Sequence, residues 1–98
     1  MQLCRLVHYL QSRQVVEVQH FADVAVTGLA YDSRQVQPGD LFVAWKGFTT
    51  DGYRYIPQAL ERGAVAVVAE RALELARPVP LLVTPNARSA LAHLAACF

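Results

Sequence analysis

The sequence lacks the features that mark several large classes of protein. No apolar run approaches the roughly 20 residues that a helix needs to cross a bilayer. The polar first segment does not resemble a signal peptide. Nine basic residues are scattered singly along a chain with eight acidic ones, so no basic stripe is available for nucleic acid. We therefore expect a cytoplasmic domain that binds neither membranes nor nucleic acid.

Cysteine is scarce, and its placement argues against a metal site. Cys4 and Cys97 lie near opposite ends of the chain and form neither a CxxC motif nor another metal-ligand spacing. Two small core side chains are the simpler interpretation. The histidines are isolated from one another at His8, His20 and His93. We predict no metal site in these residues.

Catalytic motifs are also missing. Gly47 and Gly52 have the glycine spacing of a P-loop, but neither Lys-Ser nor Lys-Thr follows them. Ser33 has no nearby histidine in the sequence and no nucleophile-elbow glycines. The aspartates around it resemble the caps that end strands and begin helices. We therefore expect no catalytic residue in this chain.

What the sequence does contain is an alternation of short apolar segments with amphipathic ones. Ninety-eight residues, 54% of them hydrophobic, suit one domain with a modest core. Apolar residues at helical spacing predict helices, and compact apolar runs predict strands. The expected helices are 2–12, one between 56 and Gly63, a single turn at 72–76, and one that follows Asn86 with a stripe of Ala87, Leu91, Leu94, Ala95 and Phe98. The expected strands are 15–18, 26–32, 41–45, 64–69 and 80–84.

Strands that alternate with single helices are typical of the α/β class, with helices on both faces of a sheet. Pro38 and Gly39 fit the two central positions of a type II turn. Such a turn between two strands makes a purely parallel sheet unexpected. We predict one small α/β domain over residues 1–98, with a mixed sheet flanked by helices and the 41–45 strand covered on both faces.

Residues 28–52, GLAYDSRQVQPGDLFVAWKGFTTDG, carry most of the polar chemistry. Side chains alternate along a strand, so Tyr31 and Ser33 are expected on one face, with Asp32 and Arg34 on the other. We expect Asp32 and Arg34 to pair and to have a structural role. A flat ring and a hydroxyl on the same side would suit a planar ligand that forms hydrogen bonds.

The loop that follows the 41–45 strand is the second candidate for ligand binding. Ligands of open α/β sheets lie at the carboxyl ends of strands, and glycine lets the backbone approach them closely. Phe48 can stack on a base, while Thr49 and Thr50 supply hydroxyl groups. A plain turn is the alternative, because Asp51-Gly52 is a common turn dipeptide. The residues alone leave both interpretations open.

A resemblance to a known family connects these motifs. Residues 26–70, VTGLAYDSRQVQPGDLFVAWKGFTTDGYRYIPQALERGAVAVVAE, resemble the amino-terminal domain of the Mur ligases, most closely that of the E-type (MurE) enzymes. The family pattern is a strand, Asp-Ser-Arg, Pro-Gly-Asp-Leu-Phe-Val-Ala, Gly-x-x-x-Asp-Gly, and a helix that ends in Gly-Ala. Every one of these motifs is present. The later segment PNARSALAHLAACF resembles the family's linker helix into its second domain.

The resemblance implies a part in the synthesis of bacterial peptidoglycan precursors. In the family, the first domain binds the UDP part of UDP-N-acetylmuramoyl-dipeptide. The central domain binds ATP and magnesium, and the third brings the amino acid whose amine attacks an acyl phosphate. The resemblance places the UDP-sugar contacts at Tyr31, Ser33, Phe48, Thr49 and Thr50.

The resemblance also implies that the chain is one domain of three, ending before the central and carboxyl-terminal domains. The family's Gly-Thr-x-Gly-Lys-Thr phosphate loop does not occur in the 98 residues. We therefore expect no cofactor and no catalysis in this chain by itself. Two alternatives stay open: the first domain of an F-type Mur ligase, and a non-catalytic α/β interaction or regulatory module.

The first prediction concerns ATP. The purified 98-residue chain is expected not to release phosphate from ATP, because its sequence has no phosphate loop to hold the β- and γ-phosphates. A malachite-green assay against a buffer blank measures this. Phosphate release well above the blank, and persisting through a further purification step, would refute the expectation.

Overall fold

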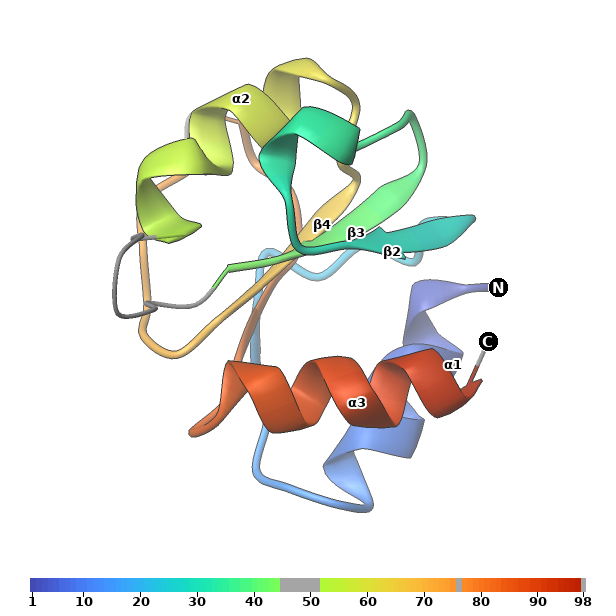
Figure 1. The fold of residues 1–98 in the computed structure, drawn as a ribbon. Coiled ribbons are helices and arrows are strands. Elements are labelled where there is room, and N and C mark those ends of the chain that lie inside the picture. Colours follow the sequence, from blue (N-terminus) through green and yellow to red (C-terminus); the bar gives the residue numbers. More distant parts are fainter. Residues whose placement is uncertain (45–51, 76, 98) are drawn as a thin grey trace.

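The computed structural model describes residues 1–44, 52–75 and 77–97, and Figure 1 shows their fold. None of the helices in these ranges is long and apolar enough to cross a membrane. The elements in chain order are α1 (Leu3–Gln11), β1 (Glu17–Gln19), β2 (Gly28–Ala30), the 3-10 turn η1 (Ser33–Gln35), β3 (Asp40–Val43), the 3-10 turn η2 (Gly52–Tyr55), α2 (Ile56–Glu61), β4 (Ala66–Ala69), β5 (Leu81–Val83) and α3 (Ala87–Cys97).

The strands form one mixed sheet in the order β1-β5-β4-β3-β2. Strands β2 to β5 are parallel, and β1 lies antiparallel to β5 at one edge. The mixed α/β sheet is therefore confirmed, but the reason we gave for it was wrong. The turn at Pro38-Gly39 does not join a hairpin, because the chain crosses over through η1 and enters β3 parallel to β2.

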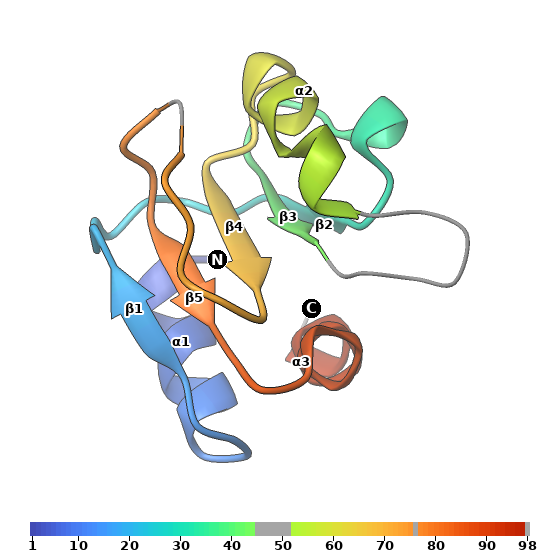
Figure 2. The ribbon, with the colours of Figure 1, turned by 90° about the vertical axis from the view of Figure 1, so that its left-hand side faces the viewer.

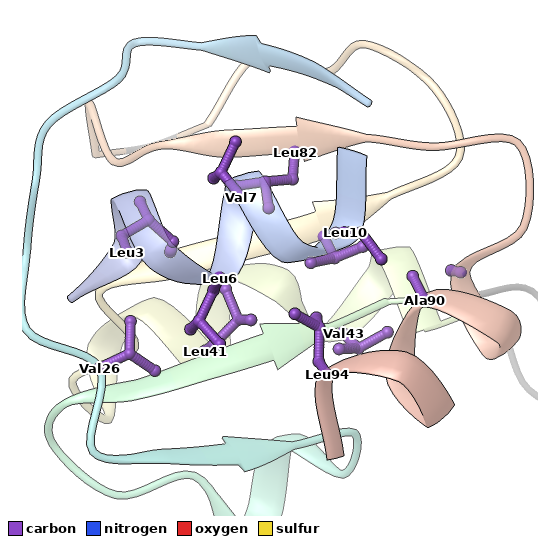
Figure 3. Close-up of a cluster of buried hydrophobic side chains, with 13 residues drawn as sticks. Leu3, Leu6, Val7, Leu10, Val26, Leu41, Val43, Leu82, Ala90 and Leu94 are labelled. Atoms are coloured by element: carbon purple, nitrogen blue, oxygen red, sulfur yellow. The ribbon is translucent and has the colours of Figure 1, made fainter. Parts of the chain in front are cut away.

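Helices cover both faces of the sheet. In Figure 1, α1 and α3 lie below it, and η1 and α2 lie above. Leu41 and Val43 of β3 belong to the hydrophobic core between the sheet and helices α1 and α3, which Figure 3 shows in close-up. Phe42, between them in the sequence, belongs to the hydrophobic core between the opposite face of the sheet and α2. Burial of one such side chain contributes about 1.5–3 kcal/mol. The prediction that this strand is covered on both faces is confirmed for its described residues.

The helices follow their apolar stripes. Leu3, Leu6, Val7 and Leu10 of α1 are all buried, as the helical spacing predicts. Asn86 caps α3, since its Oδ1 accepts a hydrogen bond from the Ser89 N–H at 3.0 Å.

Two of the helix predictions are wrong in detail. In α3, Ala90 is buried and Ala95 is exposed, because Ala90 and Leu94 lie one helical turn apart on the face that meets the sheet. Phe98 lies outside the described residues. At 72–75 there is no helical turn. Leu73 and Leu75 instead pack, partly buried, against the α2 side of the core, and this spacing of two residues suits an extended segment.

Gly63 ends α2 in a conformation that favours glycine. Its φ is +104°, and its carbonyl accepts a hydrogen bond from the Gly39 N–H at 3.0 Å. A Cβ at this position would lie 2.7 Å from Pro38 Cα. The end of α2 is therefore packed directly against the turn that leads into β3.

A left-handed backbone costs an alanine roughly 1–2 kcal/mol. We expect Gly63→Ala to destabilise the fold by more than this, because Pro38 must also move to make room for the new Cβ. Chemical denaturation of the variant measures this. Glu61→Ala, at an exposed position of the same helix, is the control. Equal stability of the two variants would contradict the argument.

Candidate ligand-binding site at the carboxyl ends of the strands

Four strand ends lie along one edge of the sheet. Because β2 to β5 are parallel, the residues that follow them begin at Tyr31, Ala44, Glu70 and Thr84 along that edge. Figure 2 shows β3, β4 and β5 pointing toward the side on which α3 begins. Ligands of open α/β sheets occupy the crevice outside such strand ends. This edge is therefore the candidate binding site.

Tyr31 and Ser33 both lie at this edge, but they do not share a strand face. Strand β2 ends at Ala30, before either residue, and Ser33 is the first residue of η1. Tyr31 is 64% exposed, whereas Ser33 is 5% exposed. The alternation expected over 26–32 was wrong here because the strand is shorter than its apolar pattern. Both residues nevertheless follow the end of β2 and so lie at the predicted edge of the sheet.

Helix α2 is joined to the η1 crossover by two side-chain hydrogen bonds. Ser33 Oγ donates to Gln58 Oε1 at 2.8 Å, and Arg62 Nε donates to the Val36 carbonyl at 3.1 Å. Gln58 was not among the predicted site residues. The available signal was its spacing of four from Arg62, which places both side chains on one face of a helix.

The predicted pairing of Asp32 with Arg34 is confirmed, and its geometry is bidentate. Arg34 Nε and Nη2 donate to Oδ1 and Oδ2 of Asp32 at 3.1 and 2.9 Å. Asp32 Oδ1 also accepts from the Arg34 N–H at 3.0 Å and so caps η1. The hydrogen bonds from the Arg34 side chain, followed by that from its backbone, lower the pKa of Asp32 to about 2. Because 81% of the Arg34 side chain is exposed, solvent weakens the attraction between these charges.

The start of α3 is closed by acceptors from the protein itself. Glu70 Oε2 accepts from the Ala87 N–H at 3.0 Å, while Asn86 occupies the Ser89 N–H. These are N–H groups that an anion at a helix start would need. These two N–H groups are therefore already paired within the protein.

A separate hollow of about 260 Å³ lies between α2 and the segment that follows β4. Its lining includes Tyr53, Pro57, Arg71 and Leu73, and the Arg71 guanidinium lies 4.8 Å from the centre of the Tyr53 ring. Of the predicted site residues that the structure describes, neither Tyr31 nor Ser33 lines this hollow.

The remaining predicted contacts, Phe48, Thr49 and Thr50, lie outside the described residues, as does Gly47. In sequence they follow β3, which pairs with β2. Over the ranges that the structure does describe, no three His, Cys, Asp or Glu side chains gather in the manner of metal ligands.

Comparison with known proteins finds one family. The family model described as "Mur ligase family, catalytic domain" matches residues 25–98. The chain is 64% identical over 74 residues to the UDP-N-acetylmuramyl-tripeptide synthetase of Roseiflexus sp. (strain RS-1), covering 74% of this chain and 14% of that protein. It is 41% identical over all 98 residues to the UDP-N-acetylmuramoyl-L-alanyl-D-glutamate–2,6-diaminopimelate ligase of Bacillus licheniformis, covering 19% of that protein.

Among solved structures, MurF from Acinetobacter baumannii matches the fold with a TM-score of 0.74 at 25% identity, covering 91% of this chain and 20% of that one. The chain thus spans 14–20% of the length of these three proteins. Its fold is that of a small α/β unit within a much longer ligase.

The lowered pKa of Asp32 predicts a pH dependence of stability. Its folded value of about 2 lies below the ordinary 3.8, so between these values the folded chain binds fewer protons than the unfolded chain. The stabilising contribution is therefore complete above pH 3.8 and is lost as the pH falls through about 2. Over this range, we expect wild-type stability to fall more steeply than that of Asp32→Asn, which keeps an oxygen for the Arg34 N–H but cannot ionise.

Urea denaturation at several pH values measures both slopes. Glu61→Gln, which also removes one exposed negative charge, controls for the change in net charge. Parallel slopes for wild type and Asp32→Asn would show that the Asp32–Arg34 pair does not carry this effect.

Proposed function

The chain belongs to the Mur ligase family, and from this premise we propose that it binds the UDP part of UDP-N-acetylmuramoyl-dipeptide. In this proposal it is the first domain of a MurE-like ligase of peptidoglycan precursor synthesis. ATP, magnesium and the incoming amino acid are bound by the central and carboxyl-terminal domains. The name of the Bacillus licheniformis relative contains both a UDP-N-acetylmuramoyl peptide and an amino acid, which supports this class of substrate.

The observation that carries the proposal is a hydroxyl held in place at the carboxyl edge of the sheet. Ser33 Oγ is fixed by Gln58, on a crossover that Asp32 caps. In a uridine nucleotide the base presents one N–H between two carbonyl groups. A hydroxyl oxygen can accept from that N–H, and backbone N–H groups can donate to the carbonyls.

The other proposed contacts come from the same crossover and from the segment that follows β3. Tyr31 offers an exposed aromatic ring two residues before Ser33. Phe48, Thr49 and Thr50 follow β3, the strand beside β2. We assign these three residues to the UDP-sugar on the family pattern that surrounds them.

Sequence identity favours an E-type over an F-type enzyme. Identity to the Bacillus licheniformis 2,6-diaminopimelate ligase is 41% over the whole chain, compared with 25% to MurF of Acinetobacter baumannii. The fold is common to both types and does not separate them. The choice of amino acid belongs to the part of the ligase beyond this chain.

Titration of the labelled 98-residue chain with UDP tests the proposal by amide chemical-shift mapping, with CMP and AMP as controls. We expect UDP to shift amides at 31–34 and 47–52. Shifts confined to residues 64–84, with both of those segments silent, would contradict the site.

Ser33→Ala is expected to weaken UDP binding by about tenfold at most, because one neutral hydrogen bond contributes roughly 0.5–1.5 kcal/mol. Ser12→Ala, at an exposed serine that follows α1, is the matched control and should leave affinity unchanged. Equal affinities of the two variants would remove Ser33 from the site.

A further inference from the structure

The hydrogen bond between Ser33 and Gln58 has a direction, and that direction limits what Ser33 can offer a ligand. A serine hydroxyl carries one proton and two lone pairs. In this structure the proton points to Gln58 Oε1, over an Oγ–Oε1 distance of 2.8 Å. Toward any further partner, Ser33 Oγ is therefore an acceptor of hydrogen bonds and not a donor.

Several contacts keep the hydroxyl in this state. Ser33 is almost completely buried, and a buried hydroxyl without a hydrogen-bond partner is costly, which favours the bond to Gln58. Its backbone begins a turn that Asp32 caps. Gln58 lies on α2, which Arg62 joins to the same crossover through the Val36 carbonyl. Donor and acceptor are thus on two segments that are held together independently of their own bond.

An acceptor at this position distinguishes between pyrimidines. Position 3 of the uracil ring carries an N–H in a nucleotide, whereas position 3 of cytosine carries a lone pair. The uracil N–H can donate to Ser33 Oγ, but the cytosine nitrogen would face it lone pair to lone pair. A hydroxyl whose proton is not engaged could bind either base, by accepting from the uracil N–H or by donating to the cytosine nitrogen.

We propose that Gln58 is a positioning residue that sets the preference of this site for uracil over cytosine, by engaging the Ser33 proton and leaving only lone pairs for the base. This inference rests on the proposed binding of UDP. It concerns a residue of α2 that acts through Ser33 and need not touch the nucleotide.

Three substitutions separate this role from simple support of the fold. Gln58→Glu keeps an acceptor for the Ser33 proton, so the ratio of UDP to CDP affinity should be retained even if the added charge weakens both. Gln58→Leu frees the hydroxyl to rotate, and the ratio should fall roughly three- to tenfold, about the value of one neutral hydrogen bond. Gln58→Lys presents only donors, which leaves the Ser33 proton for the ligand, so the ratio should fall at least as far.

The affinities of UDP and CDP for the 98-residue chain are measured by NMR titration of each variant. Gln35→Leu, at an exposed glutamine in the same 3-10 turn as Ser33, is the matched control and should keep the wild-type ratio. A double-mutant cycle of Ser33→Ala and Gln58→Leu on unfolding tests the contact without any ligand, and we expect the two changes to be non-additive.

The outcomes separate the two levels of the argument. Loss of the UDP preference in Gln58→Leu and Gln58→Lys, with its retention in Gln58→Glu, supports the inference. Normal UDP binding with an unchanged ratio in all variants, or strict additivity in the cycle, overturns the role of Gln58 and leaves the proposed function intact. Failure of the wild-type chain to bind UDP overturns both.

Discussion

Parallel pairing of β2 to β5 is the constraint on which the rest of this structure depends. Parallel neighbours cannot be joined by a tight hairpin, so the chain must cross a face of the sheet between each pair. Here the crossings are made by η1, by α2, and by the extended segment that follows β4, while α1 and α3 cover the opposite face. One consequence is burial of β3 and β4 from both sides. The other is that four carboxyl ends share one edge.

The shortest crossing connects the fold to its proposed function. Only nine residues separate β2 from β3, and they hold a 3-10 turn capped by Asp32 and a glycine turn packed against Gly63. This compact path brings Ser33 against α2, where Gln58 accepts a hydrogen bond from its hydroxyl. The contacts that close the crossover are therefore the same contacts that orient the hydroxyl at the edge.

Apolar spacing was sufficient to predict the parts of the fold in which burial decides the structure. It located α1 and the doubly covered β3, while a glycine after the apolar stripe of α2 marked the end of that helix at Gly63. It failed where local polar contacts compete with regular structure. The run from 26 to 32 alternates like a strand, yet the Asp32 carboxylate caps a turn and β2 ends at Ala30. The antiparallel pairing of β1 with β5 depends on contacts between distant segments, which no local pattern shows.

The candidate site divides in the same way. Tyr31, Ser33 and the Asp32–Arg34 pair belong to one short motif, so a single sequence was enough to select them. Gln58 lies 25 residues further along and became part of the site only because α2 packs against η1. Gln58 contributes by accepting the hydrogen bond of the Ser33 hydroxyl, which is possible only because the fold brings the two side chains within hydrogen-bond distance.

The most direct test of a uridine site at this edge is a set of intermolecular NOEs between the protein and bound UDP. The carboxyl-edge site predicts cross-peaks from uracil H5 and H6 to the ring of Tyr31, and from the uracil imino proton H3 to the β-protons of Ser33. Cross-peaks to Tyr53, Pro57 and Leu73, which line the separate hollow beside α2, would place the nucleotide there instead. That result would contradict the central claim.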